Sequence, residues 1–290
     1  MTDFLQFLFS GITVGAAYAL TALGFTIIYN TSGVINFAQG EFIMLGGMLS
    51  ATLVAAGMPL YAAIALAVII TGGVGLIIER LAIEPAKNAD VITLIIITIG
   101  AALIIRGLIQ VVLGKGTYAL PSFSGDDPIM VLEATIMSQS FWVLGVSLAV
   151  VLLLRWFFGR TMLGKAMLAT SYNMLASQLV GVNTRSILLL SFGLSAVLGA
   201  IGGAILAPIT LTSYDIGIML GLKGFVAAVL GGMGSATGVV AGGLILGIAE
   251  SMTAGYISSS YKDAVPFILI LLILFVKPNG LFAAASSERV

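Results

Sequence analysis

The sequence predicts an all-α membrane protein, a polytopic bundle of about eight long transmembrane helices with short broken or half-spanning segments between them. Hydrophobic residues make up 60% of the 290 positions, charged residues make up only 8%, and the mean hydropathy is +1.18. An ordinary soluble domain carries about 25% charged residues. We therefore interpret residues 1–290 as a single transmembrane domain.

The individual spans are apolar stretches near the ~20 residues that a helix needs to cross a bilayer. These stretches are residues 4–29, 42–56, 60–78, 91–113, 141–158, 187–209, 239–252 and 265–276. The first has no basic flank and is too long for a signal peptide, so we expect it to be retained as a span. Helix ends are expected to extend beyond several of these limits.

Two stretches are apolar but interrupted, residues 29–41 and 221–238. Non-helical backbone at membrane depth is tolerated only where it is buried in protein or faces a water-filled cavity. Paired interruptions in corresponding places point to a transport pathway, and here each interruption precedes two spans, which suggests a duplicated core. The candidate pathway residues are Asn36, Gln39, Glu41, Gly231, Gly232, Gly234, Ser235 and Glu250.

Three ionisable residues, Glu41, Arg106 and Glu250, fall within apolar segments. A charge at the bilayer centre costs ~2.5–3.5 kcal/mol on insertion scales, so each is a candidate functional residue. The alternative is a structural role, in which each is paired or hydrogen-bonded against a neighbouring helix. Glycine repeats at a spacing of four, such as Gly11 with Gly15, indicate close helix packing more than a pathway lining.

Basic residues predict the orientation, because they concentrate in cytoplasmic loops. One set of segments carries Arg80, Lys87, Arg155, Arg160, Lys165, Arg185, Lys277 and Arg289. The intervening segments carry Asp126, Asp127, Glu133, Asp215 and Asp263, with Lys115, Lys223 and Lys262. We therefore expect residues 159–185 and the C-terminus to be cytoplasmic and residues 114–140 to lie outside. The side of the N-terminus stays open.

The longest hydrophilic stretch, residues 159–185, is expected to form one or two short helices on the membrane surface. They are either a plain interfacial element or a docking platform for a soluble partner. Residues 159–166 fall one hydroxyl short of a phosphate-binding loop, because Ala166 follows Lys165 where such a loop needs Ser or Thr. The chain is therefore not expected to bind ATP itself. It contains no Cys and no His, which argues against thiolate metal sites and the usual catalytic base.

With these motifs the sequence resembles the permease subunits of the high-affinity branched-chain amino acid ABC transporters over essentially its whole length. The matching stretches are residues 11–40, with Tyr18-Ala-Leu and Val34-Ile-Asn-Phe-Ala-Gln-Gly-Glu; 159–183, ending Leu179-Val-Gly-Val-Asn; 221–251, with Ala227-Ala-Val-Leu-Gly-Gly-Met-Gly-Ser and Gly242-Gly-Leu-Ile-Leu-Gly-Ile-Ala-Glu-Ser; Tyr261-Lys-Asp; and Lys277-Pro-Asn-Gly-Leu. The combination is more specific than any one of its parts.

The resemblance implies a subunit of the bacterial inner membrane that works with a second permease, two cytoplasmic ATPases and an extracytoplasmic solute-binding protein. No cofactor is implied in this chain, since ATP and Mg²⁺ would be held by the ATPases. The family docks its ATPase through a Glu-Ala-Ala-x₃-Gly pattern, and here Leu175 stands at the acidic position. The implied docking residues are Gly164, Lys165, Leu175, Ala176, Ser177 and Gly181.

The expected function is import of branched-chain or other apolar amino acids, driven by the separate ATPases. A pathway with few fixed charges suits a zwitterion with an apolar side chain. Import of another small solute, such as a urea-like amide, stays open. So do a stand-alone channel, which would not need a docking segment, and a membrane-embedded enzyme, which would need converging polar groups.

Overall fold

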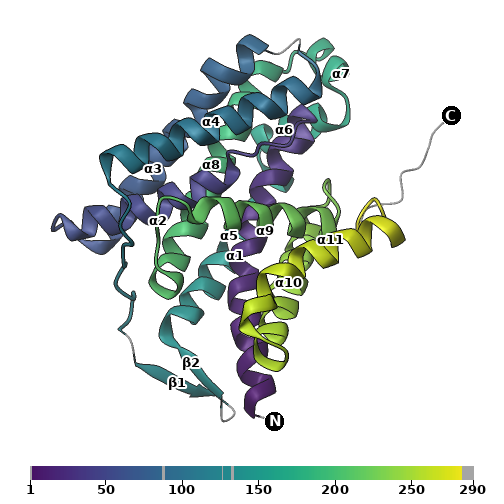
Figure 1. Cartoon of the computed structure of the whole chain (residues 1–290). Coiled ribbons are helices and arrows are strands. Elements are labelled where there is room, and N and C mark those ends of the chain that lie inside the picture. The colour runs from purple at the N-terminus through teal and green to yellow at the C-terminus, as the bar shows by residue number, and fades with distance from the viewer. Residues whose placement is uncertain (1, 87–88, 126, 132–133, 283–290) are drawn as a thin grey trace.

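The computed structural model describes residues 2–86, 89–125, 127–131 and 134–282, which form a helical bundle with one small hairpin (Figure 1). Of the charges used above to predict orientation, Lys87, Asp126, Glu133 and Arg289 lie outside the described residues. Within the described part, seven helical segments are long and apolar enough to cross a membrane: Thr2–Ser32, Leu60–Ala86, Val91–Val112, Ser138–Arg160, Thr184–Thr210, Ala236–Tyr256 and Ser259–Val276. The all-α membrane class is confirmed.

Most of these segments are single helices, named α1 (Thr2–Ser32), α4 (Val91–Val112), α5 (Ser138–Arg160), α8 (Thr184–Thr210) and α10 (Ala236–Tyr256). The two others are composite. The α3 helix (Leu60–Ile78) continues through the short turns η1 (Glu79–Ile83) and η2 (Glu84–Ala86), and the turn η3 (Ser259–Ala264) leads into α11 (Val265–Val276).

Two apolar helices are shorter, the 17-residue α2 (Gln39–Ala55) and the 16-residue α9 (Ile216–Gly231). The stretch 42–56, expected among the long spans, thus forms a helix that begins at the first interruption. The α9 helix is the short segment expected after residue 221, and it begins five residues earlier than that. Each short helix adjoins one of the two interruptions.

The centre of the bundle is α1, which lies against α10, α8 and α9 (Figure 1). Most of its apolar window is buried, 89% against 11% for the peripheral segment Ser259–Val276. Small residues make this close packing possible. A Cβ atom added to Gly15 of α1 would stand 2.8 Å from the carbonyl oxygen of Gly243 in α10, so the two backbones are in direct contact. The packing interpretation of the glycine repeats is confirmed.

The segment between α4 and α5 contains a two-stranded antiparallel hairpin, β1 (Pro128–Val131) paired with β2 (Ala134–Met137), which the sequence did not predict. The Gln6 side chain holds it to the start of α1, because its amide donates to the Thr135 carbonyl at 2.7 Å and its oxygen accepts from the Thr135 N–H at 2.8 Å. The hairpin therefore lies at the N-terminal end of α1 (Figure 1).

The opposite end of the bundle carries α6 (Met162–Tyr172) and α7 (Met174–Leu179), near the label α7 in Figure 1. One or two short helices were expected in residues 159–185, and the structure has two there. The hairpin and these helices thus mark the two ends of the molecule.

Candidate functional site

The first interruption is a six-residue break, residues 33–38, between α1 and α2. Gly33 has a φ of +70°, which ends α1 in a conformation that few other residues adopt. Gln39 opens α2 and is fully buried; its amide donates to the Ser195 carbonyl at 3.2 Å, and the Ser195 hydroxyl donates to its oxygen at 2.5 Å. The break is therefore held to α8 by a side-chain hydrogen-bond pair.

The two short helices α2 and α9 cross at glycine residues. A Cβ atom added to Gly40 would stand 2.1 Å from the Gly217 carbonyl oxygen and 3.0 Å from the Cα of Gly221. No side chain larger than hydrogen fits there without moving the backbone. This crossing brings the two interrupted stretches, which are far apart in sequence, into direct contact.

The second interruption, residues 232–235, lies between α9 and α10. Gly232 and Gly234 have φ angles of +97° and +118°, and the Ser235 hydroxyl accepts from the Gly238 N–H at 3.1 Å as the N-cap of α10. A Cβ atom added to Gly231 would stand 2.2 Å from the Gly238 carbonyl oxygen. Only residues 232–235 lie outside the helices, while Gly231 at the end of α9 and Gly238 in α10 meet in close backbone contact.

The C-terminal segment closes over this second interruption. The N–H of Leu281 donates to the Leu230 carbonyl at 2.9 Å, and that of Phe282 donates to the Gly231 carbonyl at 3.2 Å. These bonds satisfy carbonyl groups at the end of α9 that have no partner within the helix. The Lys277-Pro-Asn-Gly-Leu motif therefore has a structural role: it leads the chain back to the end of α9.

Glu41 and Arg106 form an ion pair between α2 and α4. The Glu41 carboxylate is 1% exposed, while one of its oxygens and the Nε of Arg106 have no hydrogen-bond partner among the described residues. Pairing neutralises both charges at membrane depth. The ion pair fixes α4 to α2, the helix that follows the first interruption. Otherwise α4 has few contacts with the bundle.

Glu250 belongs to a four-residue network that the sequence did not predict. The Lys223 ammonium donates to Glu250 at 2.6 Å and to Asp263 at 2.7 Å, and the Tyr18 hydroxyl donates to the other Glu250 oxygen at 2.9 Å. Lys223 was assigned to an outward-facing loop, and that assignment is wrong: it lies inside α9 and is 6% exposed. The sequence did contain a signal for this buried position, because Lys223 lies within the apolar run of residues 216–231.

Another charged cluster lies at the end of the bundle that carries α6 and α7. Glu84 of η2 accepts from Arg80 at 2.6 Å and also pairs with Arg185 at the start of α8. The Glu84–Arg185 ion pair therefore connects the segment between α3 and α4 to the start of α8. The sequence placed these arginines on one side of the membrane without predicting their shared partner.

The docking residues implied by the resemblance lie on α6 and α7. Lys165, Leu175 and Ala176 are exposed, whereas Ser177 is buried and Gly164 packs against the end of α5, where an added Cβ would stand 2.2 Å from the Phe157 carbonyl oxygen. Gly181 has a φ of +89°, and the Val182 N–H donates to the Ser177 carbonyl at 3.0 Å. The expected left-handed helix ending at Gly181 is confirmed.

Large apolar side chains surround these positions on the open surface. Leu175 is 72% exposed and Leu179 is 89% exposed, and the other strongly exposed members of the two helices and their exit are Met162, Leu163, Tyr172 and Val180. An apolar patch of this kind, rimmed by polar residues, is typical of a protein or membrane contact.

A cavity of about 630 Å³ lies between α1, α5, α6 and α10. Of the eight candidate pathway residues, only Gly234 lines it. Most of the others are buried in contacts between helices or at the breaks. Their role in a pathway therefore stays a prediction.

Among the described residues, no group of three or more His, Cys, Asp or Glu side chains is placed to hold a metal ion. The ion pairs Glu41–Arg106 and Lys223–Glu250 link different helices and so stabilise the arrangement of the spans.

Comparison with known proteins identifies the family. The profile of the permease component of the branched-chain amino acid transport system matches residues 7–274. The high-affinity branched-chain amino acid transport system permease protein LivH of Escherichia coli K12 is 36% identical over 304 aligned residues, which cover 99% of this chain and 98% of that protein. The corresponding protein BraD of Pseudomonas aeruginosa is 33% identical, with the same coverage.

A solved structure supports the fold. The chain matches PsaBC from Streptococcus pneumoniae in complex with Fab with a TM-score of 0.50 and 16% identity, covering 96% of this chain and 91% of that one. At this identity the likeness concerns the fold alone. Taken with the full-length sequence matches, the chain belongs to the family of permease components of the branched-chain amino acid transport system.

Proposed function

We propose that this chain is the membrane-spanning permease subunit of an ABC importer that carries branched-chain or other apolar amino acids into the cytoplasm. The observation that carries this proposal is the match to such permeases over nearly the whole chain. The bundle agrees with it, because Glu41 with Arg106 and Lys223 with Glu250 are paired between helices and are not free to hold an ionic cargo. A zwitterion with an apolar side chain suits such a pathway.

Energy would come from separate ATPase subunits, which hold ATP and Mg²⁺. Residues 159–185 are proposed to receive their force, since α6 and α7 combine exposed apolar side chains with a rigid exit at Gly181. Exposed apolar patches of this kind are typical of surfaces that contact another protein or a membrane. The other partners would be a second permease and an extracytoplasmic solute-binding protein.

The proposed location is the bacterial inner membrane, with residues 159–185 and the C-terminus in the cytoplasm. The distribution of basic residues supports this orientation. The position of α6–α7 and of the β1–β2 hairpin at opposite ends of the bundle is compatible with it (Figure 1). ATP-driven closure of the ATPases would then rock the spans between inward- and outward-facing states.

Reconstitution tests the proposal. The chain, co-expressed with the transport genes that neighbour it, is purified and placed in vesicles with ATP at the ATPase side. We expect the ATPase to co-purify, and labelled leucine to enter when the binding protein and ATP are both present. Ribose and urea serve as control solutes. Leucine flux without ATP would support a stand-alone channel instead, and uptake of urea without leucine would reassign the cargo.

A further inference from the structure

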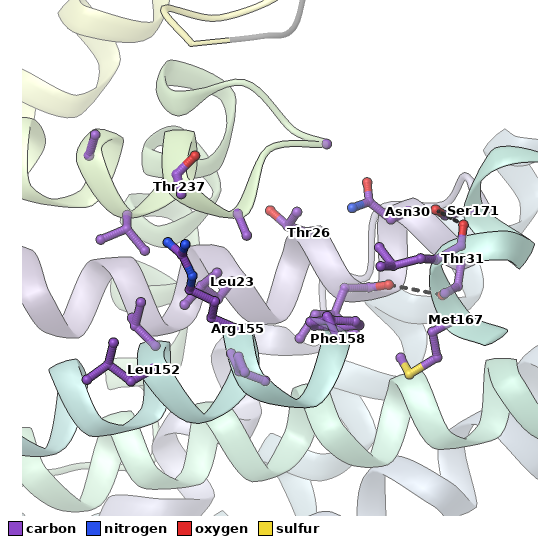
Figure 2. Close-up of a pocket in the computed structure, with 18 of the residues that line it drawn as sticks. Leu23, Thr26, Asn30, Thr31, Leu152, Arg155, Phe158, Met167, Ser171 and Thr237 are labelled. Carbon is purple, nitrogen blue, oxygen red and sulfur yellow. Dashed lines mark hydrogen bonds between the residues drawn. The ribbon is translucent and has the colours of Figure 1, made fainter. Parts of the chain in front are cut away.

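The cavity between α1, α5, α6 and α10 is lined mostly by apolar side chains, with a few polar groups among them (Figure 2). In the close-up, Thr26, Asn30 and Thr237 lie along one side, while Leu152, Phe158 and Met167 lie along the other. Its volume of about 630 Å³ falls within the range of about 300–1,000 Å³ that holds drug-sized ligands. A molecule with one polar and one apolar part fits such walls.

The floor of the cavity is buried and its rim is open. Ile27 of α1 and Met167 of α6 are 5% and 1% exposed, whereas Leu152 of α5 and Leu168 of α6 are 57% and 39% exposed. Leu152 belongs to the outer apolar face of α5, a helix that buries only 17% of its apolar window. The cavity is therefore continuous with the exposed apolar face of α5.

One charged residue, Arg155, lines the cavity, and no Asp or Glu does so. Its guanidinium points from α5 toward the helix that carries Thr237 (Figure 2). The Arg155 side chain forms no hydrogen bond or ion pair with any residue that the structure describes. An unpaired guanidinium favours an anion, and its planar donors match phosphate well.

The depth of Arg155 agrees with a lipid headgroup. The next residue, Trp156, is 60% exposed. Arg160, less than two helical turns after Arg155, is the last residue of α5. Tryptophan concentrates at membrane interfaces, and basic side chains near helix ends reach toward the headgroups. Arg155 thus stands where the phosphate of a lipid in the adjoining leaflet would lie.

We infer that this cavity is a binding site for an anionic phospholipid, with the phosphate on Arg155 and an acyl chain along the Leu152–Met167 side. Basic pockets between transmembrane helices on the cytoplasmic side are known to hold such headgroups. Because α6 forms one wall, the bound lipid would contact the segment proposed to dock the ATPase. The inference concerns the membrane-facing surface and does not depend on which solute is carried.

The cargo fits this cavity less well. The lining carries the single positive charge of Arg155 and no carboxylate, so its net charge matches a phosphate better than a zwitterion whose own charges cancel. The volume also exceeds what a single leucine fills. Both observations favour a lipid as the occupant.

Native mass spectrometry of the full transporter tests the inference. The complex is purified in mild detergent, supplied with dioleoyl phosphatidylglycerol, and the lipid retained per copy of this chain is measured. Arg155→Gln removes one charge-assisted contact, so retention should fall about tenfold, which corresponds to about 1.4 kcal/mol. Arg160→Gln, on the same helix but outside the cavity lining, should retain the lipid like the unaltered chain.

A second pair of variants tests the apolar part without altering charge. Ala241→Phe places a ring in the cavity and should reduce retention, whereas Ala149→Phe on the exposed face of α5 should not. Equal retention in Arg155→Gln and the unaltered complex overturns the inference. So does displacement of the lipid by inorganic phosphate alone, which would show a free-anion site.

Two further outcomes would assign the cavity to another occupant. Loss of leucine uptake in Arg155→Gln with unchanged lipid retention would place the cargo there. Efficient disulfide formation between Leu152→Cys and a cysteine on the second permease would show that this face is a subunit interface. Either result overturns the lipid site.

Discussion

Glycine serves two different purposes in two regions of this protein. Around the second interruption two glycines are enclosed: Gly231 touches the backbone of Gly238, and Gly232 touches that of Gly280. On the surface segment that contains α6 and α7, Gly181 also has a positive φ, but a Cβ atom added there would meet nothing within 4 Å. In the interior, glycine is needed both because no side chain fits and because φ is positive. At Gly181 on the surface, only the positive φ calls for glycine.

This difference predicts which property each substitution damages. A side chain in the enclosed region must displace backbone, so its effect spreads through helices that are packed together. A side chain at Gly181 strains one local turn and leaves the bundle intact. Interior changes should therefore act on the transport machinery as a whole, and surface changes on coupling to the partner.

The largest effect is expected for Gly232→Leu. Gly232 has a φ of +97°, and a Cβ atom added to its neighbour Gly280 would already stand 2.3 Å from the Gly232 Cα. Reconstituted uptake should be abolished, while the protein still inserts into the membrane. Gly145→Leu on α5, where an added Cβ meets nothing within 4 Å, is the matched control and should transport normally. Normal uptake by Gly232→Leu would contradict the enclosed geometry.

The next effect concerns the charges buried in the same interior. Lys223→Met leaves Glu250 buried without its cation, which costs ~3–5 kcal/mol when one partner of a buried pair is removed. The midpoint of thermal unfolding in detergent should fall clearly. Lys262→Met, at an exposed position of η3, serves as the control.

A double variant sharpens that prediction. Replacing both partners with apolar residues, as in Lys223→Met with Glu250→Leu, removes the unpaired charge and should restore part of the lost stability. If the double variant is no more stable than the single one, the Lys223–Glu250 contact is not what holds α9 to α10.

A smaller and more selective effect is expected for Gly181→Val. A left-handed conformation costs about 1–2 kcal/mol for a residue with a side chain, and more for a β-branched one. We expect substrate-coupled ATP hydrolysis and co-purification of the ATPase to fall, with membrane levels near those of the unaltered chain. Gly181→Asn, which tolerates this conformation, should retain most of the coupling. Normal coupling in Gly181→Val would show that this segment does not transmit the force.

The smallest perturbation is a test of orientation. The sequence contains no cysteine, so single cysteines at Lys165 and Ser124, both exposed, can report the side on which each lies. In intact cells an impermeant thiol reagent should label position 124 and spare position 165. Labelling of position 165 alone would reverse the orientation and remove α6–α7 from the cytoplasm.

The sequence by itself determined the features that depend on local composition. Long apolar runs imply spans, because a bilayer accepts only backbone that satisfies its own hydrogen bonds. Gly231-Gly-Met-Gly implied a break and Gly181 a helix ending, because glycine alone adopts a positive φ at low cost. The full-length resemblance also identified the family from its short motifs. These signals lie within a few neighbouring residues.

The tertiary structure decided which distant residues meet. Lys223 could not be paired from sequence, since its partners Glu250 and Asp263 lie 27 and 40 residues away on other elements. The Glu84–Arg185 pair, the crossing of α2 with α9 and the cavity beside Arg155 arise in the same way. Each depends on the directions in which several helices pack, and apolar composition does not specify those directions, because lipid and protein interiors are equally apolar surroundings for a span.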